Sequence, residues 1–293
     1  MSASAPPTRP RPGLRARLAL RSLALVYLGM LLLLPLGMVF YRTFESGLGA
    51  VWDAMSDPAF THAFKLTVIV VAIAVPVNTI FGIVCALALV RRGSTRGNGL
   101  LNAAIGLPLA LSPVIVGLAL VLVYGKDGWL GGWLLDHGVR IVFALPGMVL
   151  ATIVVSLPFV MREVVPVLRE IGTDQEQAAS TLGASGWQTF RRITLPAIRW
   201  GVAYGVVLTT ARALGEYGAV AVVSGKIAGR TETLTLHVEE RFVSFEPVAA
   251  YTAALVLAVL AVLTLLAMNV FKPRTRKEAA DGDRSAPGDE AVR

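Results

Sequence analysis

The sequence predicts an all-α integral membrane protein with six transmembrane helices, and three observations lead to this fold class. Hydrophobic residues make up 55% of the 293 residues, and the mean hydropathy is +0.67. Six apolar runs are each close to or longer than the roughly 20 residues that a helix needs to cross the hydrocarbon core of a bilayer. Lys and Arg gather in alternate segments between these runs. The chain is long enough for two soluble domains, but the apolar runs exclude that organisation.

The first predicted span, residues 22–41, follows a Pro- and Arg-rich cytoplasmic tail, residues 1–21, that we expect to be disordered. The span is longer than the roughly 7–15 apolar residues of a signal peptide, and no small-residue cleavage site follows it, so we expect it to be retained. The other five predicted spans are 64–90, 101–124, 141–161, 200–223 and 248–271. A second cytoplasmic tail, residues 272–293, follows the last span.

The distribution of positive charge predicts the orientation. With the N-terminus inside, 19 of the 27 Lys and Arg residues fall on the cytoplasmic side, 7 fall on the opposite side, and Arg212 lies within a span. By the positive-inside rule, both termini and the segment 173–196 lie in the cytoplasm (N-in/C-in). Membrane topology therefore explains the net charge of +8, and we expect no nucleic-acid partner.

The third predicted span contains Pro108 and the pair Ser112 and Pro113. Proline removes a backbone donor and bends or breaks a helix. Within a membrane such breaks are tolerated where protein or a water-filled cavity covers them. Two interpretations stay open: the bends serve packing alone, or they line a translocation pathway, for which these three residues are candidates.

The fifth predicted span carries two ionisable residues, Arg212 and Glu216. Because they are four residues apart, they lie on one helix face and can form an ion pair. Ionisable groups in a membrane usually face the bundle interior or a polar cavity. We predict that both belong to the translocation pathway, with a purely structural ion pair as the alternative.

The polar segment 173–196, TDQEQAASTLGASGWQTFRRITLP, lies between two apolar segments. Thr173 and Glu176 have the spacing of a capping box at a helix start. Gly183 suits the end of that helix, since glycine tolerates the backbone angles of a C-cap. Ser185 and Gln188 can start a second short helix. The local prediction is two short helices around a glycine turn.

This segment resembles the EAA loop of ABC-importer permeases, whose pattern is E-A-A, three residues, G, nine residues, and I-x-L-P. Pro196 also suits the first turn of a following helix. Gln177 stands where the family has Glu. Whether this chain makes an ion pair at that position is therefore left open. The resemblance implies a type I importer permease fold with a coupling helix that docks in a groove of a cytoplasmic ATPase. A generic amphipathic loop and a DNA-reading helix-turn-helix are the weaker alternatives. The residues that the resemblance assigns to coupling are Gln177, Ala178, Ala179, Gly183, Ile193, Leu195 and Pro196.

Three further segments, 107–125, 182–225 and 231–242, resemble the sulfate/thiosulfate branch of these permeases, in particular its W-type subunit. The similarity runs over 64–271, the expected permease domain, with 22–63 as a first helix and external loop. It implies a second homologous permease subunit, two copies of an ATP-binding subunit and an extracytoplasmic sulfate/thiosulfate-binding protein, besides membrane lipid. The implied location is the inner membrane, which the chain would cross several times. Molybdate, tungstate or another oxyanion remains the alternative substrate.

The sequence has no pattern that is typical of catalysis or of a cofactor site. It contains no G-x-x-x-x-G-K-[ST] run for ATP, no H-E-x-x-H or C-x-x-C pattern for a metal, and no paired nucleophile and base. We therefore expect that the chain is not an enzyme and that it binds no cofactor or metal. We expect His62, His137 and His237 to be ordinary surface residues of external loops. An ATP-independent anion transporter or channel and a membrane enzyme are the alternatives from other classes.

Overall fold

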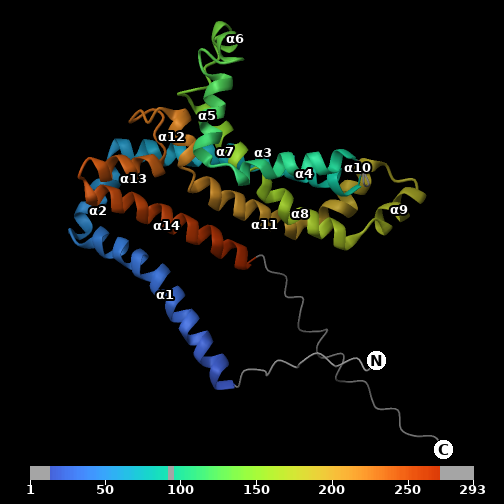
Figure 1. Cartoon of the computed structure of the whole chain (residues 1–293), viewed down its shortest axis with the longest axis horizontal. Helices are drawn as coiled ribbons and strands as arrows, with labels where there is room; N and C mark the ends of the chain where they lie inside the picture. The colour runs from blue at the N-terminus through green and yellow to red at the C-terminus, as the bar shows by residue number, and fades with distance from the viewer. Residues whose placement is uncertain (1–13, 92–95, 271–293) are drawn as a thin grey trace, which may run out of the picture.

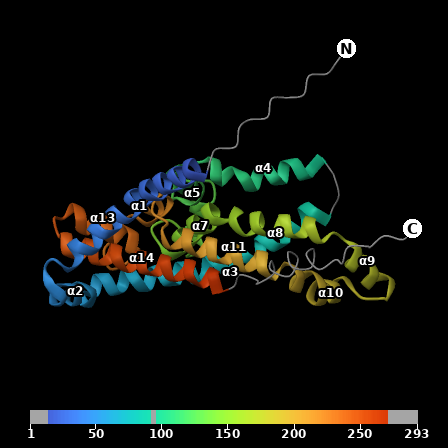
Figure 2. The same ribbon diagram turned by 90° about the horizontal axis from the view of Figure 1, so that it is seen from below.

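The computed structural model describes residues 14–91 and 96–270, and every regular element in these two ranges is a helix (Figure 1). The long helices α3, α8, α11 and α14 run along the length of the molecule, with α9 and α10 at one end and α2 and α13 at the other (Figures 1 and 2). The elements are α1 (Leu14–Phe44), α2 (Gly47–Ser56), α3 (Pro58–Arg91), α4 (Arg96–Ala110), α5 (Pro113–Tyr124), α6 (Gly131–Asp136), α7 (Leu145–Ser156), α8 (Pro158–Ile171), α9 (Asp174–Thr181), α10 (Gly186–Thr189), the π-helix η1 (Phe190–Thr194), α11 (Leu195–Leu214), α12 (Gly218–Ser224), α13 (Leu234–Val243) and α14 (Pro247–Val270).

Five helical stretches in the described ranges are long and apolar enough to cross a membrane: Arg21–Phe44, Pro58–Arg91, Leu145–Ile171, Gly186–Leu214 and Pro247–Ala267. The expected third span is divided, because α4 ends at Ala110 and α5 begins at Pro113. Proline suits the first turn of a helix, where its missing N–H costs nothing, so Pro113 starts a new helix. Figure 1 shows α5 turning away from the direction of α4. The described residues thus contain five such helices and a broken third segment in place of six continuous spans.

Several other boundaries also differ from the expectation: the stretch predicted as 141–161 covers Leu145–Ile171, and the one predicted as 64–90 begins at Pro58. The fifth span, predicted to reach residue 223, stops at Leu214, and α12 begins only at Gly218. At the start of the chain, α1 begins at Leu14, so residues 14–21 of the expected disordered tail are helical. The remainder of that tail, residues 1–13, and the tail 272–293 lie outside the described residues.

The backbones of α3 and α11 approach α8 closely on both sides of Val160. A Cβ atom added to Gly82 of α3 would lie 2.7 Å from the Val160 Cβ, and one added to Gly205 of α11 would lie 2.7 Å from the Val160 Cα. Small residues permit such close approach of helices in membrane proteins. Val164, Leu168 and other fully buried side chains extend this contact. The three helices therefore form a tightly packed core that leads to the end of the molecule where α9 and α10 lie.

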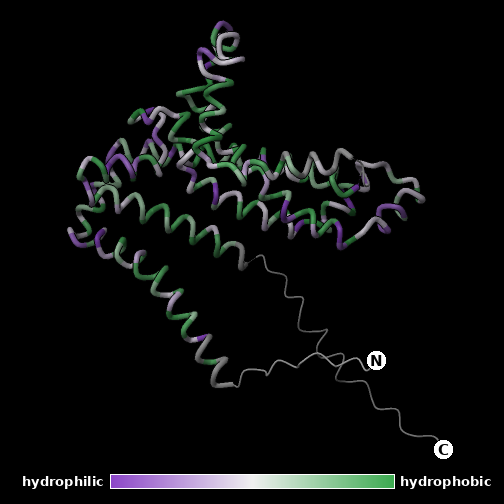
Figure 3. The backbone as a smooth tube through the Cα atoms, viewed as in Figure 1, coloured by the Kyte–Doolittle hydropathy of each residue, from purple (hydrophilic) through white to green (hydrophobic). Residues whose placement is uncertain are grey.

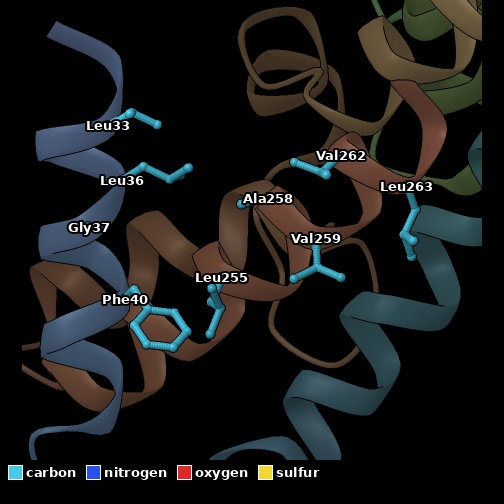
Figure 4. A pocket seen from close by; sticks show the side chains of 9 residues that line it. All are labelled: Leu33, Leu36, Gly37, Phe40, Leu255, Ala258, Val259, Val262 and Leu263. Atoms are coloured by element: carbon cyan, nitrogen blue, oxygen red, sulfur yellow. The ribbon is translucent and has the colours of Figure 1, made fainter. Parts of the chain in front are cut away.

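Helix α1 stands apart from this core and packs on α14 and α2 (Figure 1). Its apolar side chains are mostly exposed; Leu33, for example, is 69% exposed. A groove of about 410 Å³ separates it from α14, with Leu33 and Phe40 on one wall and Leu255 and Val259 on the other (Figure 4). In a membrane protein, an apolar surface of this kind contacts lipid or another helix.

Polar residues concentrate at the two ends of the long axis. Figure 3 shows hydrophobic residues along α1, α3 and α14, and hydrophilic residues over α9 and α13. This arrangement is typical of a helical bundle whose middle lies in a bilayer and whose ends lie in water.

Candidate coupling loop and translocation site

In the loop between α8 and α11, the glycine turn and the start of the second short helix have the local structure that the sequence predicts. Gly183 has a φ of +82°, the left-handed conformation expected where α9 ends. Ser185 and Gln188 form a capping box, in which the Ser185 N–H donates to Gln188 Oε1 at 2.9 Å and the Gln188 N–H donates to Ser185 Oγ at 3.3 Å. The second short helix is continuous with the next one, because η1 joins α10 to α11 without a break.

The capping box predicted at Thr173 and Glu176 is wrong. The Thr173 side chain makes no cap hydrogen bond and accepts one at 3.0 Å from the Gln177 amide instead. The Glu176 carboxylate points to two side chains outside α9: its Oε2 lies 2.9 Å from Arg91 Nε, and its Oε1 accepts a hydrogen bond of 2.7 Å from Thr194 Oγ1. A charged partner binds a carboxylate more strongly than a neutral backbone N–H does, so the tertiary contact replaces the local one.

The seven residues of the EAA-like pattern divide into an exposed and an anchored set. Gln177, Ala178, Gly183 and Pro196 are exposed, whereas Ala179, Ile193 and Leu195 are half-buried. Leu195 packs against the core formed by α3, α8 and α11. Two large apolar side chains of the loop also reach solvent, Leu182 at 87% and Trp187 at 68% exposure. The loop thus offers an apolar contact surface outside and an anchor inside.

The predicted ion pair in the fifth span is present, with Arg212 Nη1 and Glu216 Oε2 2.5 Å apart. The setting differs from the expectation, since Arg212 lies in the last turn of α11 and Glu216 lies in the break before α12. Glu216 Oε1 accepts a hydrogen bond of 2.9 Å from the Ala219 N–H and so caps α12. The Glu216 side chain is 2% exposed and that of Arg212 is 30% exposed. A buried carboxylate therefore holds a partly accessible guanidinium at the helix break.

The two helix breaks lie against each other. A Cβ added to Gly218, at the start of α12, would lie 3.0 Å from the Pro113 Cβ at the start of α5. A Cβ added to Gly117 would lie 2.8 Å from the Ala219 carbonyl oxygen, so α5 and α12 stay in close contact. Of the predicted pathway residues, Pro113, Arg212 and Glu216 belong to this junction. Ser112 is exposed at the start of α5, and Pro108 lies earlier, within α4.

His237 is buried, so the prediction that it is an ordinary surface residue is wrong. Its side chain is 1% exposed, and its Nδ1 lies 3.0 Å from Oε1 of Glu232, which is itself 2% exposed. Leu234, three residues earlier on α13, is buried as well, and this helical i, i+3 spacing from an apolar residue is the signal that could have indicated a buried histidine. Both buried side chains belong to the segment between α12 and α14, which the charge distribution places outside the membrane.

A group of possible metal ligands lies here, since His237, Glu232 and Glu240 each place one ligand atom within 4.8 Å of the others. Two cations compete for this position: Arg241 Nε lies 3.4 Å from Glu240 Oε2, and Lys226 lines the same cavity of about 210 Å³. Positive charge so close weakens the binding of a further cation. The geometry favours a cluster of ion pairs and hydrogen bonds that fixes the external segment.

The known proteins that this chain resembles are membrane components of transport systems. Residues 78–277 match the family described as "Binding-protein-dependent transport system inner membrane component". The sulfate transport system permease protein CysW of Synechocystis sp. is 50% identical over 89% of this chain and 94% of its own length. CysW of Escherichia coli is 47% identical over 87% and 89% of the two chains. CysT of Escherichia coli, also named as a sulfate transport system permease, is 34% identical over 86% and 90%.

Solved structures agree on the fold. A bacterial alginate ABC transporter, in complex with its alginate-bound periplasmic protein, includes a chain with a TM-score of 0.71 and 18% identity. The match covers 89% of this chain and 95% of that one. At this identity the likeness concerns the fold alone, which is that of a type I importer permease. Together with the apolar helices, these matches identify a multi-pass protein of the inner membrane. The chain belongs to the family of binding-protein-dependent transport system inner membrane components, which implies a binding protein and an ATP-binding subunit as partners.

Proposed function

We propose that this chain is the W-type permease subunit of an ATP-driven importer that moves sulfate and thiosulfate across the cytoplasmic membrane. The observation that carries the proposal is the identity of 47–50% with permeases named for sulfate transport, over nearly the whole length of both chains. The identity with a CysT permease is lower, at 34%, and this difference supports the W-type assignment.

The ATP-binding partner would bind the exposed part of the loop 173–196. Leu182 and Trp187 are large apolar side chains exposed to solvent on a polar loop, and tryptophan in particular frequently anchors protein interfaces. Gln177, Ala178 and Gly183 of the same loop are exposed as well. In the proposed assembly two copies of the ATPase bind, one to this loop and one to the equivalent loop of the other permease subunit.

The second permease subunit would cover the apolar face of α1. This helix buries little of its surface within the chain, and the groove between α1 and α14 offers the apolar lining that a helix of a partner needs (Figure 4). Lipid would cover the remaining apolar surface. The extracytoplasmic anion-binding protein would approach the opposite end of the molecule, where α2 and α13 lie.

The junction of the two helix breaks is the proposed part of the translocation pathway. Arg212 offers a positive charge to a passing oxyanion, while its pairing with the buried Glu216 reduces the net charge at that point. A weaker field permits release, since an anion bound too tightly within the membrane would stop transport. Closure of the ATPase dimer would move the loop, and the helices would then open alternately to the two sides.

Uptake of labelled sulfate tests this function. Cells that lack this chain and any redundant sulfate system should lose uptake, and restoring the chain should recover it. Thiosulfate should compete strongly and phosphate weakly. Competition mainly by molybdate or tungstate would transfer the substrate assignment to those anions. Uptake that persists after ATP depletion would favour an ATP-independent transporter or channel.

A further inference from the structure

We propose that Glu176 is a positioning residue that ties the coupling loop to α3, through a latch formed by Arg91, Glu176 and Thr194. The proposal rests on the proposed function, because it concerns the transmission of movement from an ATPase to the membrane helices. It assigns to Glu176 a task that differs from docking: the residue faces the membrane helices and not the partner.

The three members of the latch come from three different elements. Arg91 is the last residue of α3, Glu176 lies in the first turn of α9, and Thr194 ends η1 directly before α11. Arg91 reaches both oxygens of the carboxylate, with Nε 2.9 Å from Oε2 and Nη2 donating to Oε1 at 3.0 Å. Thr194 donates to Oε1 at 2.7 Å.

The latch also touches the core of the bundle. Arg91 Nη1 donates to the Leu168 carbonyl oxygen of α8 at 3.4 Å, and Leu168 is fully buried. One carboxylate on the loop is therefore connected to α3, to the start of α11 and, through Arg91, to α8. These are the helices that pack at backbone distance around Val160, so a displacement of Glu176 acts on a rigid unit.

Among the described residues, no other ion pair joins α9 to a neighbouring helix. None of its residues is buried, so α9 cannot transmit movement through close-packed apolar side chains as the core helices do. The side chains of Arg91 and Glu176 are only 18% and 22% exposed. Ion pairs with this degree of burial, supported by further hydrogen bonds, are stronger and less screened by salt than pairs on the open surface. The latch is thus the polar link by which α9 can pull on the membrane helices.

Gln177, the residue next to Glu176, has a different environment. Gln177 is exposed, and its amide donates a hydrogen bond to Thr173 at the start of its own helix. The family pattern has Glu at this outward position, and this chain has its carboxylate one residue earlier, directed inward. The loop therefore combines an uncharged outward side chain with a charged inward one.

The test uses the complete transporter, reconstituted in lipid vesicles with its partner permease, ATPase and binding protein. Glu176→Gln keeps the size of the side chain and removes its charge. We expect the number of ATP molecules hydrolysed per sulfate imported to rise at least about fivefold, the lower end of typical coupling between two sites. Glu170→Gln, which removes an exposed carboxylate of α8, is the matched control and should leave this ratio unchanged.

A charge exchange distinguishes pairing from a general structural effect. Arg91→Glu/Glu176→Arg should bring the ratio back toward the wild-type value, compared with Glu176→Arg alone. Thr194→Val removes one hydrogen bond and keeps the ion pair, so it should raise the ratio by a smaller factor. It also serves as the decisive variant if Glu176→Gln does not assemble.

Three results would overturn the latch: a wild-type ratio in an assembled Glu176→Gln transporter, a wild-type ratio in Thr194→Val, or a charge exchange no better than Glu176→Arg alone. Failure of the proposed function gives a different result. In that case the wild-type chain itself neither assembles with an ATPase nor imports sulfate.

Discussion

Two of the Arg–Glu pairs in the described residues use the same chemistry in opposite settings. Arg91 and Glu176 are 85 positions apart, both are partly accessible, and they connect separate helices. Arg212 and Glu216 are four positions apart, and Glu216 is almost fully buried. The first pair joins the coupling loop to the core, whereas the second pair ends one helix and starts the next.

Because of this difference, we expect substitutions at the two ion pairs to have different effects. Breaking a buried pair leaves an uncompensated charge in a poorly hydrated environment, which costs stability. Breaking a pair near the surface costs less stability, because water can hydrate the charge that is left. We therefore expect variants near Glu216 to damage folding, and variants of the coupling loop to damage the use of ATP.

The largest effect is expected for Arg212→Ala, which leaves the carboxylate of Glu216 buried without its cation. The cost should be about 3 kcal/mol in the free energy of unfolding. Arg212→Ala/Glu216→Ala removes both charges and should be less damaging, although it loses the cap of α12, at about 1 kcal/mol. Thermal unfolding in detergent and labelled sulfate uptake measure the two consequences. Equal losses in the free energy of unfolding in the single and double variants would refute a coupled pair.

The buried pair of His237 and Glu232 extends the comparison to the external segment. His237→Leu leaves Glu232 without its hydrogen-bond partner, and an unsatisfied buried group of this kind costs about 1–3 kcal/mol. Glu232→Met/His237→Leu replaces both partners by apolar side chains and should recover most of that loss. A double-mutant cycle of unfolding midpoints measures the coupling. Additive effects of the two substitutions would show that the pair contributes little.

The sequence predicts the local parts of this architecture better than the tertiary ones. Gly183 and the Ser185–Gln188 capping box follow from rules that involve a few neighbouring residues. The contacts of Glu176 depend on Arg91, which a pattern within the loop cannot locate. The division of the expected third span was indicated by Pro113, but the sequence alone does not distinguish a kink from a complete break. The contact between the two breaks depends on packing between α5 and α12, and no local pattern encodes it.

Gly183 tests whether the coupling loop controls transport more than stability. Gly183→Val forces a β-branched residue into a left-handed conformation, at a cost of about 1–2 kcal/mol. Gly183→Asn accepts that conformation at lower cost, and no atom lies within 4 Å of an added Cβ. We expect uptake to be lost in the valine variant and largely retained in the asparagine variant, with both proteins present in the membrane. Loss of the valine variant from the membrane would show that the glycine acts mainly on folding.

The smallest effect is expected at an exposed pair, Lys226 and Glu239, whose side chains are 44% and 34% exposed. The hydrogen bond from Lys226 is the main cause that lowers the pKa of Glu239 below its ordinary value of 4.5, while partial burial opposes the shift. The folded state therefore favours the ionised carboxylate, so the contribution is fully present above pH 4.5 and is lost as the pH falls through the lowered pKa.

Glu239→Gln removes this contribution and should cost less than about 1 kcal/mol at neutral pH. The difference in unfolding midpoint between the wild type and this variant should shrink as the pH is lowered below 4.5, and high salt should reduce it at neutral pH. A loss as large as that of Arg212→Ala would contradict the comparison, because it would mean that exposure does not decide what an ion pair contributes in this protein.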